Sequence, residues 1–227
     1  MSGGARGSLT TFDETIKLQQ PDAQVLIAAY NCGCFPMADP TTGLIDWYSP
    51  DPRGVLPLDR FHVPRSLARV VRQERFEIHV DRSFHEVLTQ CSRLGQAPEQ
   101  NWLDPRIMEA VMQLHRMGMA HSVEAWSDGR LVGGLYGISL GGAFFGESMF
   151  CRPGDGGRDA SKVCLVHLVR RLRDRGYRLL DVQFVNDHLR QFGVVEIPVH
   201  EYDQALEEAL RTECRFVEPA QTIAGSM

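Results

Sequence analysis

Two polar clusters interrupt apolar, strand-like segments on either side of one helix-like segment, and this arrangement limits what the chain can fold into. Glu147 stands within the apolar run 144–150, and Asp181 opens the second run, 181–188, which also carries glutamine and asparagine. The residues between them, from about 161 to 175, have the apolar spacing of an amphipathic helix. Carboxylate and amide groups are costly to bury without partners. They therefore indicate either a structural hydrogen-bond network or a site that carries out chemistry.

The composition is that of a globular protein with a sizeable core. The 227 residues suffice for one large domain or two small ones, and the formal net charge is -5 with 43% hydrophobic residues. No apolar run reaches the length that spans a membrane. Residues 1–12 lack an apolar core, which predicts a flexible tail and not a secretory signal. Only Cys32 and Cys34 of the six cysteines lie close together, which predicts reduced thiols and no metal site.

Local signals predict helices in the first half of the chain and a strand meander after residue 120. Asp and Pro suit a helix start, as at Asp104-Pro105, and Gly commonly ends a helix. Residues 35–64 contain six prolines, which predicts short strands and loops. A meander, a helix and a further strand are typical of an α+β fold with a mixed sheet. The expected helices cover about residues 21–33, 64–73, 83–92, 104–118, 161–175 and 186–193, and the expected strands 76–80, 121–126, 131–139, 143–150 and 177–185.

The arginines and tryptophans each admit two interpretations from the residues alone. Arg65, Arg69 and Arg72 recur at helical spacing, as on a solvated helix face or on a face that contacts a phosphate backbone. Trp47 and Trp102 lie in polar, proline-bearing surroundings, where a tryptophan can pack at a domain seam or stack on a nucleic-acid base. The histidines have no identifiable serine or cysteine partner, so a nucleophilic triad is not expected.

A set of short sequence strings helps to choose between these interpretations. The strings follow one another in a fixed order between about Tyr30 and Pro198. The strings are YNCGCFPM (30–37), WYSP (47–50), RG (53–54), HSVE (121–124), GGLYG (133–137), GESMF (146–150), ASK (160–162), DVQ (181–183) and NDH (186–188). Each string alone is weak, but the ordered set resembles bacterial leucyl/phenylalanyl-tRNA–protein transferase. The resemblance implies a small N-terminal domain followed by an acetyltransferase-like (GNAT) domain with a mixed sheet.

The resemblance also implies an activity and its partners. Such a protein transfers Leu or Phe, with Met as a further candidate, from aminoacyl-tRNA to proteins whose N-terminal residue is Arg or Lys. The transfer tags the acceptor for degradation by the bacterial N-end rule machinery. The expected partners are Leu-tRNA, Phe-tRNA and the acceptor proteins, without cofactor, metal, DNA or membrane, and the expected location is the cytoplasm. The expected domains are 13–64 and 65–216, between tails at 1–12 and 217–227.

By the same resemblance, four polar residues belong to the catalytic site. An aminoacyl ester is already activated, so the enzyme has mainly to place an amine against its carbonyl group. Gln183 would orient the ester or the amine, and Asp181 would polarise Gln183 or help a proton leave, unless the terminal ribose hydroxyl relays it. Glu147 and Asn186 would suit a cationic acceptor. The aminoacyl pocket would comprise Leu135, Phe144, Met149, Leu165, Leu168, Leu172 and Leu180, the terminal adenosine would lie near Trp47 and Trp102, and Arg65, Arg69 and Arg72 would contact the tRNA backbone.

Two other functions stay open as alternatives. A coenzyme A-dependent N-acyltransferase would use an R-x-x-G-x-G/A loop at the start of the helix, but Arg152 is followed by glycines in a different register and by Asp155. A tRNA-binding module without catalysis would keep the tryptophans and arginines but have no use for Asp181 and Gln183. The stretch 151–159 is longer than the usual link in the family that the chain resembles.

Overall fold

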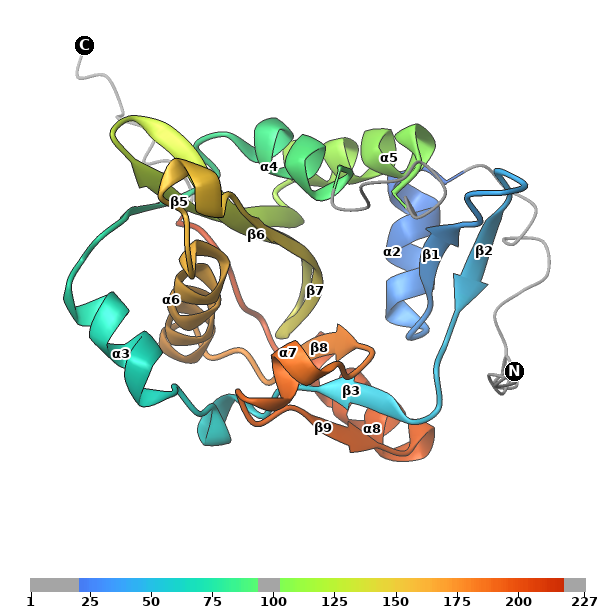
Figure 1. Ribbon diagram of the computed structural model, residues 1–227. Helices are drawn as coiled ribbons and strands as arrows, with labels where there is room; N and C mark the ends of the chain where they lie inside the picture. Colours follow the sequence, from blue (N-terminus) through green and yellow to red (C-terminus); the bar gives the residue numbers. More distant parts are fainter. Residues whose placement is uncertain (1–20, 94–102, 219–227) are drawn as a thin grey trace, which may run out of the picture.

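The fold is built on one mixed β-sheet, seen in the computed structural model, which describes residues 21–93 and 103–218 (Figure 1). The strands of this sheet are β3 (Arg53–Val55), β4 (Glu77–Val80), β5 (Ala120–Ser127), β6 (Arg130–Leu140), β7 (Ala143–Cys151), β8 (Leu179–Gln183) and β9 (Val195–Ile197). Their order is β4-β5-β6-β7-β8-β3-β9. Neighbouring strands run antiparallel except β7 and β8, which are parallel.

Helices cover both faces of the sheet (Figure 1). On one face, α6 (Ala160–Asp174) makes the crossover between the parallel strands, and α3 (Arg65–Arg72) packs beside it. The other face carries α2 (Ala23–Asn31), α4 (Phe84–Cys91), α5 (Pro105–Arg116) and α8 (Val199–Leu210). Each face is closed by its own cluster of buried apolar side chains. In the two described ranges, no helix combines the length and the apolar character needed to cross a membrane.

A small hairpin stands apart from the large sheet. It consists of β1 (Phe35–Ala38) and β2 (Ile45–Tyr48), which pair antiparallel and pack against α2. In contrast, β3 lies within the range expected for the small N-terminal domain, yet it pairs with β8 and β9 in the large sheet. The first part of the chain therefore contributes a strand that lies directly beside the second polar cluster.

The α+β class and the mixed sheet expected from the sequence are confirmed. Every expected helix and strand within the described residues has a counterpart. The start of α5 is fixed as expected, because the Asp104 side chain accepts a hydrogen bond from the Arg106 amide at 2.8 Å. No local pattern in the sequence predicted β9 or α8. In the structure, β9 pairs with β3, and Tyr202 of α8 hydrogen-bonds to Asp181.

The strands β7 and β8 pair along only part of their length, and this decides where the site forms. Their parallel register runs from Ala143 opposite Leu179 to Phe145 opposite Asp181. Beyond this point β7 continues beside β6, whereas β8 continues beside β3. The two strands therefore separate, and side chains from both faces of the sheet can meet between them.

Candidate active site

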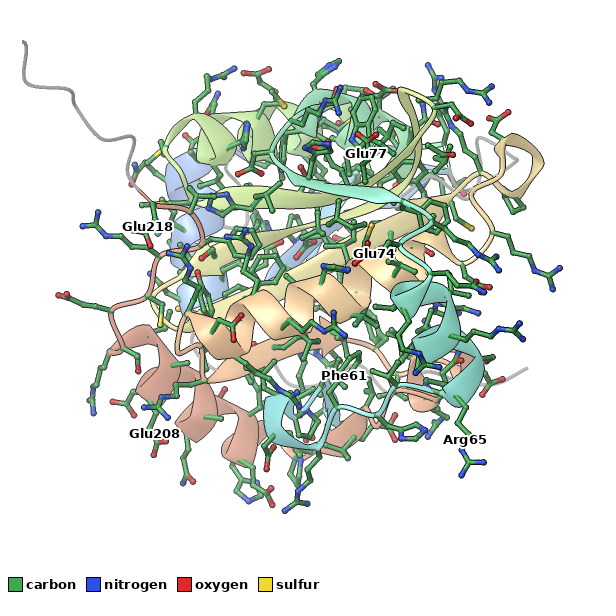
Figure 2. The ribbon with its side chains drawn as sticks, turned by 90° about the vertical axis from the view of Figure 1, so that its left-hand side faces the viewer. Phe61, Arg65, Glu74, Glu77, Glu208 and Glu218 are labelled. Carbon is green, nitrogen blue, oxygen red and sulfur yellow. The ribbon has the colours of Figure 1, made fainter. Side chains whose placement is uncertain are left out.

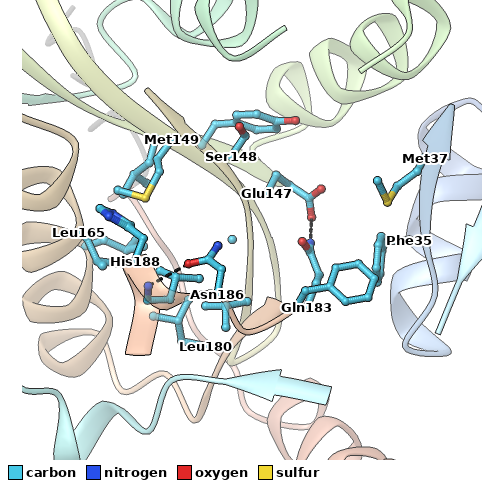
Figure 3. Close-up of a pocket in the computed structure, with 17 residues that line it drawn as sticks. Phe35, Met37, Glu147, Ser148, Met149, Leu165, Leu180, Gln183, Asn186 and His188 are labelled. Carbon is cyan, nitrogen blue, oxygen red and sulfur yellow. Dashed lines mark hydrogen bonds between the residues drawn. The ribbon is translucent and has the colours of Figure 1, made fainter. Parts of the chain in front are cut away.

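A cavity of about 340 Å³ lies where β7 and β8 separate. Side chains from α6 and the two strands line one end, and side chains from the hairpin strand β1 line the other (Figure 3). Figure 3 shows Met149, Leu165 and Leu180 at the first end, and Phe35 and Met37 across from Glu147 at the second. The cavity thus joins an apolar end to one where Glu147 and Gln183 lie across from Phe35 and Met37.

The apolar end contains most of the residues predicted for the aminoacyl pocket. Leu135, Met149, Leu165, Leu168 and Leu180 all line the cavity. On α6, positions 165 and 168 are one turn apart, so both leucines present their side chains to the same space. The cavity wall does not include the two other predicted residues, Phe144 and Leu172, which are fully buried in the hydrophobic core behind it. The Phe144 ring stacks on Phe216 with 5.2 Å between the ring centroids.

The polar end is formed by Glu147 and Gln183, which face each other across the strand separation. The Gln183 Nε2 atom donates a hydrogen bond to Glu147 Oε1 at 2.8 Å (Figure 3). Glu147 reaches this position through a β-bulge: Tyr136 pairs with Ser148 and Gly137 pairs with Gly146, so Glu147 is the extra residue on β7. A bulge of this kind redirects a side chain, here toward the cavity.

The surroundings of Glu147 favour its protonated form. Although the residue as a whole is partly exposed to the cavity, its carboxyl group is enclosed by protein. Burial raises the pKa of Glu147 to about 8, and the negative charge of Asp181 acts in the same direction. Hydrogen bonds from Tyr30 and Gln183 and the positive charge of Arg53 oppose this rise. Near neutral pH this carboxyl group can therefore take up or release a proton.

Asp181 is completely buried and serves as a junction for four hydrogen bonds. Its Oδ1 atom accepts from Arg53 Nε at 3.0 Å and from the Gln183 amide at 2.8 Å. Its Oδ2 atom accepts from Arg53 Nη2 and from the Tyr202 hydroxyl, both at 2.7 Å. Burial by itself lowers the pKa of Arg53, but the charges of Asp181, Tyr202 and Glu147 and the hydrogen bond to Asp181 together outweigh burial and raise that pKa. Asp181 does not line the cavity, so its carboxylate acts through the groups that it holds.

The backbone of Gln183 is held in a conformation that a glutamine rarely adopts. Its φ angle is +60°, in the left-handed region. The hydrogen bond from its amide to Asp181 fixes this turn, because it joins the unusual backbone to a fully buried anchor. The neighbouring strand β3 comes close at Gly54, where a Cβ atom would lie 3.2 Å from the Gln183 carbonyl oxygen. The side-chain amide is thereby aimed at the cavity.

Asn186, the fourth predicted catalytic residue, lines the cavity and also starts a short helix. Its Oδ1 atom accepts a hydrogen bond from the Leu189 amide at 2.9 Å, which caps α7 (Asp187–Arg190) (Figure 3). His188 of the same helix lies beside it, and burial lowers the pKa of this histidine. In the part of the chain that the structure describes, no three His, Cys, Asp or Glu side chains converge as metal ligands would.

Of the residues predicted to contact tRNA, those that the structure describes are not part of the cavity wall. Trp47 is only 7% exposed on β2 and is not part of the cavity wall, while Trp102 lies outside the described residues. On α3, Arg65, Arg69 and Arg72 are exposed and form no ion pair with any described residue. Figure 2 shows Arg65 pointing away from the molecule. The guanidinium groups of all three arginines thus have no ionic partner among the described residues.

Several residues that shape the site carry no signal in the sequence that predicts their role. Arg53, Tyr30, Phe35 and Met37 lie in the quoted strings, but no local pattern connects them to Asp181 or Glu147. Tyr202 belongs to no string, and its role depends on the position of α8. Arg53 and Asp181 are separated by 128 residues. Only information that links positions far apart in the sequence could have predicted that these two residues form a pair.

This fold and this cavity define a class of protein: an α+β enzyme that binds an apolar group beside a polar reaction centre. The chain belongs to the leucyl/phenylalanyl-tRNA protein transferase family, because the model of that family matches residues 55–207 and the model of its N-terminal domain matches residues 19–51. The resemblance drawn from the ordered strings is thus confirmed.

Individual relatives agree with the family. A leucyl/phenylalanyl-tRNA–protein transferase of Gloeobacter violaceus is 52% identical over 193 residues, which cover 85% of this chain and 96% of the relative. The corresponding transferase of Phenylobacterium zucineum is 51% identical over 199 residues, which cover 86% of this chain and 87% of the relative. Among solved structures, a ribosomal-protein-alanine N-acetyltransferase from Brucella melitensis matches with a TM-score of 0.39 and 18% identity, over 58% of this chain and 90% of that chain.

Proposed function

We propose that this protein transfers Leu or Phe, with Met as a further candidate, from aminoacyl-tRNA to the N-terminal Arg or Lys of acceptor proteins. Family membership supports the reaction class. The observation that carries the proposal is the cavity, which places an apolar compartment directly beside the Glu147–Gln183 pair. An aminoacyl ester has the same two parts, an apolar side chain next to a reactive carbonyl group.

The chemistry needs little more than placement and the removal of a proton. The α-amino nitrogen of the acceptor attacks the ester carbonyl, the new C–N bond forms, and the ester C–O bond to the terminal ribose breaks. The ammonium group loses one proton before the attack, and its nitrogen loses a second one as the amide forms. The ribose oxygen gains one proton and the other is released to solvent, so no cofactor is required. An α-ammonium group has a pKa of about 7.7–8.0 and must lose a proton before it attacks. The pKa of Glu147, raised to about 8, matches it, so proton transfer between them costs little.

Each polar residue then has a separate task. Glu147 takes the proton from the ammonium group. Gln183 uses its side-chain nitrogen to bind Glu147, which leaves its side-chain oxygen to accept a hydrogen bond from the attacking amine. Asp181 is a positioning residue in this scheme, because its side-chain hydrogen bonds are all with Arg53, Tyr202 and the Gln183 backbone. Asn186 lines the entrance on the side of α7 and suits a cationic acceptor side chain.

The apolar end would select the amino acid. Leu135, Met149, Leu165, Leu168 and Leu180 offer no polar side-chain partner, so a charged or amide side chain would lose its hydration without compensation. We infer that the pocket accepts side chains unbranched at Cβ, which favours Leu, Phe and Met over Ile and Val. Phe144 and Leu172 would act indirectly, by holding the wall in place.

The tRNA would extend from the cavity over the basic face of α3. Arg65, Arg69 and Arg72 would contact its phosphate backbone, and Trp47 and Trp102 would support the terminal adenosine. Binding of this kind weakens steeply as salt rises. Because aminoacyl-tRNA is made in the cytoplasm, we propose that the protein acts there. Its products would be acceptor proteins tagged for degradation by the N-end rule machinery.

One assay tests this function against its alternatives. The protein is incubated with radiolabelled Leu-tRNA and a peptide that begins with Arg, and a peptide that begins with Ala serves as control. Label should appear on the first peptide without coenzyme A. The variant Gln183→Ala should lose transfer but keep tRNA binding, whereas Gln191→Ala, at the exposed end of α7, should keep both. A requirement for acetyl-coenzyme A would favour the N-acyltransferase, and tRNA binding without any transfer would favour a binding module.

A further inference from the structure

Tyr136 carries a hydroxyl group whose hydrogen-bonding capacity is unused. Among the side chains that the structure describes, it has the one fully buried polar atom without a hydrogen-bond partner. The residue is only 1% exposed, and its ring packs edge-on against Phe84 with 6.1 Å between the centroids. An unpaired buried hydroxyl group destabilises a folded protein, so such groups are rare and call for an explanation.

The position of Tyr136 relates it to Glu147. Tyr136 lines the same cavity and lies opposite the bulge on β7, where it pairs with Ser148, the residue next to Glu147. Its hydroxyl group is close enough to be influenced by the carboxyl group. Burial raises the pKa of Tyr136 well above its ordinary value, and the negative charge of Glu147 is the second cause, followed by Cys91.

The other polar groups around Glu147 already have partners. The Tyr30 hydroxyl group hydrogen-bonds to Glu147 itself, and Gln183 does so through its side-chain nitrogen. Asp181 and Arg53, which complete the charged surroundings, are bound to each other. The groups that face Glu147 from the packed elements are thus Tyr30 on α2, Arg53 on β3, Tyr136 on β6, and Asp181 and Gln183 on β8, with Cys91 of α4 behind Tyr136. Of these groups, the Tyr136 hydroxyl group is the one that has no hydrogen-bond partner among the described residues.

We propose that Tyr136 is a positioning residue whose hydroxyl group hydrogen-bonds to the carboxyl group of Glu147 when that group exchanges a proton with the substrate amine. A tyrosine hydroxyl can both accept and donate. It can accept from the protonated carboxyl group and donate to the carboxylate, so one side chain serves both protonation states. The catalytic meaning rests on the proposed function, but the effect on Glu147 is a property of the protein alone.

The test measures the proton affinity of Glu147 in the protein without substrates. Carbon-13 NMR of labelled glutamate carboxyl groups follows the titration, and Glu147→Gln identifies the signal by its loss. In Tyr136→Phe, the carboxylate loses a hydrogen-bond donor, so the pKa of Glu147 should rise by about one unit. The matched control is Tyr177→Phe, because the Tyr177 hydroxyl group is bound to Ser139 at 2.6 Å, away from the cavity. The control should leave the titration of Glu147 unchanged.

Thermal unfolding separates this role from an ordinary structural one. Tyr177→Phe breaks an existing hydrogen bond and should lower Tm by about 2–4 °C. Tyr136→Phe removes an unpaired hydroxyl group and should leave Tm unchanged or higher. Below pH 8 the Tyr136→Phe enzyme should also transfer about tenfold more slowly, in proportion to the pKa shift. An unchanged or lower Glu147 pKa, or a Tm loss equal to that of the control, would overturn the inference. An inactive wild-type enzyme with the expected titration would overturn only the proposed function.

Discussion

Replacing Asp181 with Asn distinguishes an anchoring carboxylate from a catalytic base. The substitution keeps the shape of the side chain but puts an NH2 group where one oxygen was. Arg53 donates to both sides, through Nε to Oδ1 and through Nη2 to Oδ2. Whichever way the new amide is turned, its NH2 group therefore faces an N–H group of Arg53, and the buried guanidinium loses its counter-charge.

The expected loss of stability follows from this geometry. Removing one partner of a buried ion pair lowers the free energy of unfolding by about 3–5 kcal/mol, because the remaining charge stays buried without compensation. At roughly 2–4 °C per kcal/mol for a chain of this size, Tm should fall by roughly 6–20 °C. The control Asp187→Asn changes a fully exposed carboxylate and should stay within about 0.5 kcal/mol of wild type.

Activity is then measured at a temperature where the Asp181→Asn variant is still folded. Because repulsion between the new NH2 group and Arg53 displaces the side chain that anchors the Gln183 backbone, the transfer rate should fall by about 10–100-fold. The pH–rate profile should keep both its rising and its falling limb, since Asp181 does not reach the cavity. Because the charge of Asp181 is lost, the pKa of Glu147 should fall and the rising limb should move to lower pH. A variant with wild-type Tm and no activity would refute the anchoring argument. So would a profile that loses one of its limbs, because that would make Asp181 the base.

The remaining predictions concern the base, the pocket and the tRNA surface. If Glu147, with its pKa of about 8, takes a proton from an ammonium group of similar pKa, kcat/KM should peak near pH 8 and fall on both sides. In Glu147→Gln the rate should instead rise through the amine pKa to a plateau, and a retained bell shape would contradict the assignment. Leu165→Phe should fill the apolar end and slow transfer of Phe about tenfold more than transfer of Leu, compared by competition between the two charged tRNAs. Arg69→Gln should reduce the slope of log Kd against log salt by about 1, whereas Arg211→Gln, directly after the end of α8, should leave it unchanged.

The sequence alone predicted much of the fold, because helices and strands follow from short-range signals. The cap at Asp104, the apolar spacing from 161 to 175 and the strand-like segments after residue 120 are all signals that act over short stretches of the chain. The ordered strings identified the family, and Glu147 and Gln183, predicted from them, meet at one cavity. Five of the seven leucine, phenylalanine and methionine side chains predicted for the pocket line that cavity.

Only the tertiary structure decided how these groups act. The bulge that turns Glu147 into the cavity depends on the register between β6 and β7. The buried position of the Asp181 carboxylate depends on its ion pair with Arg53, which is 128 residues away in the sequence. Registers and distant ion pairs depend on how the whole sheet assembles, because neither has a local conformational preference that a short stretch of sequence could express. The same holds for the buried hydroxyl group of Tyr136: a sequence shows a tyrosine, but only the packed structure shows that it has no partner.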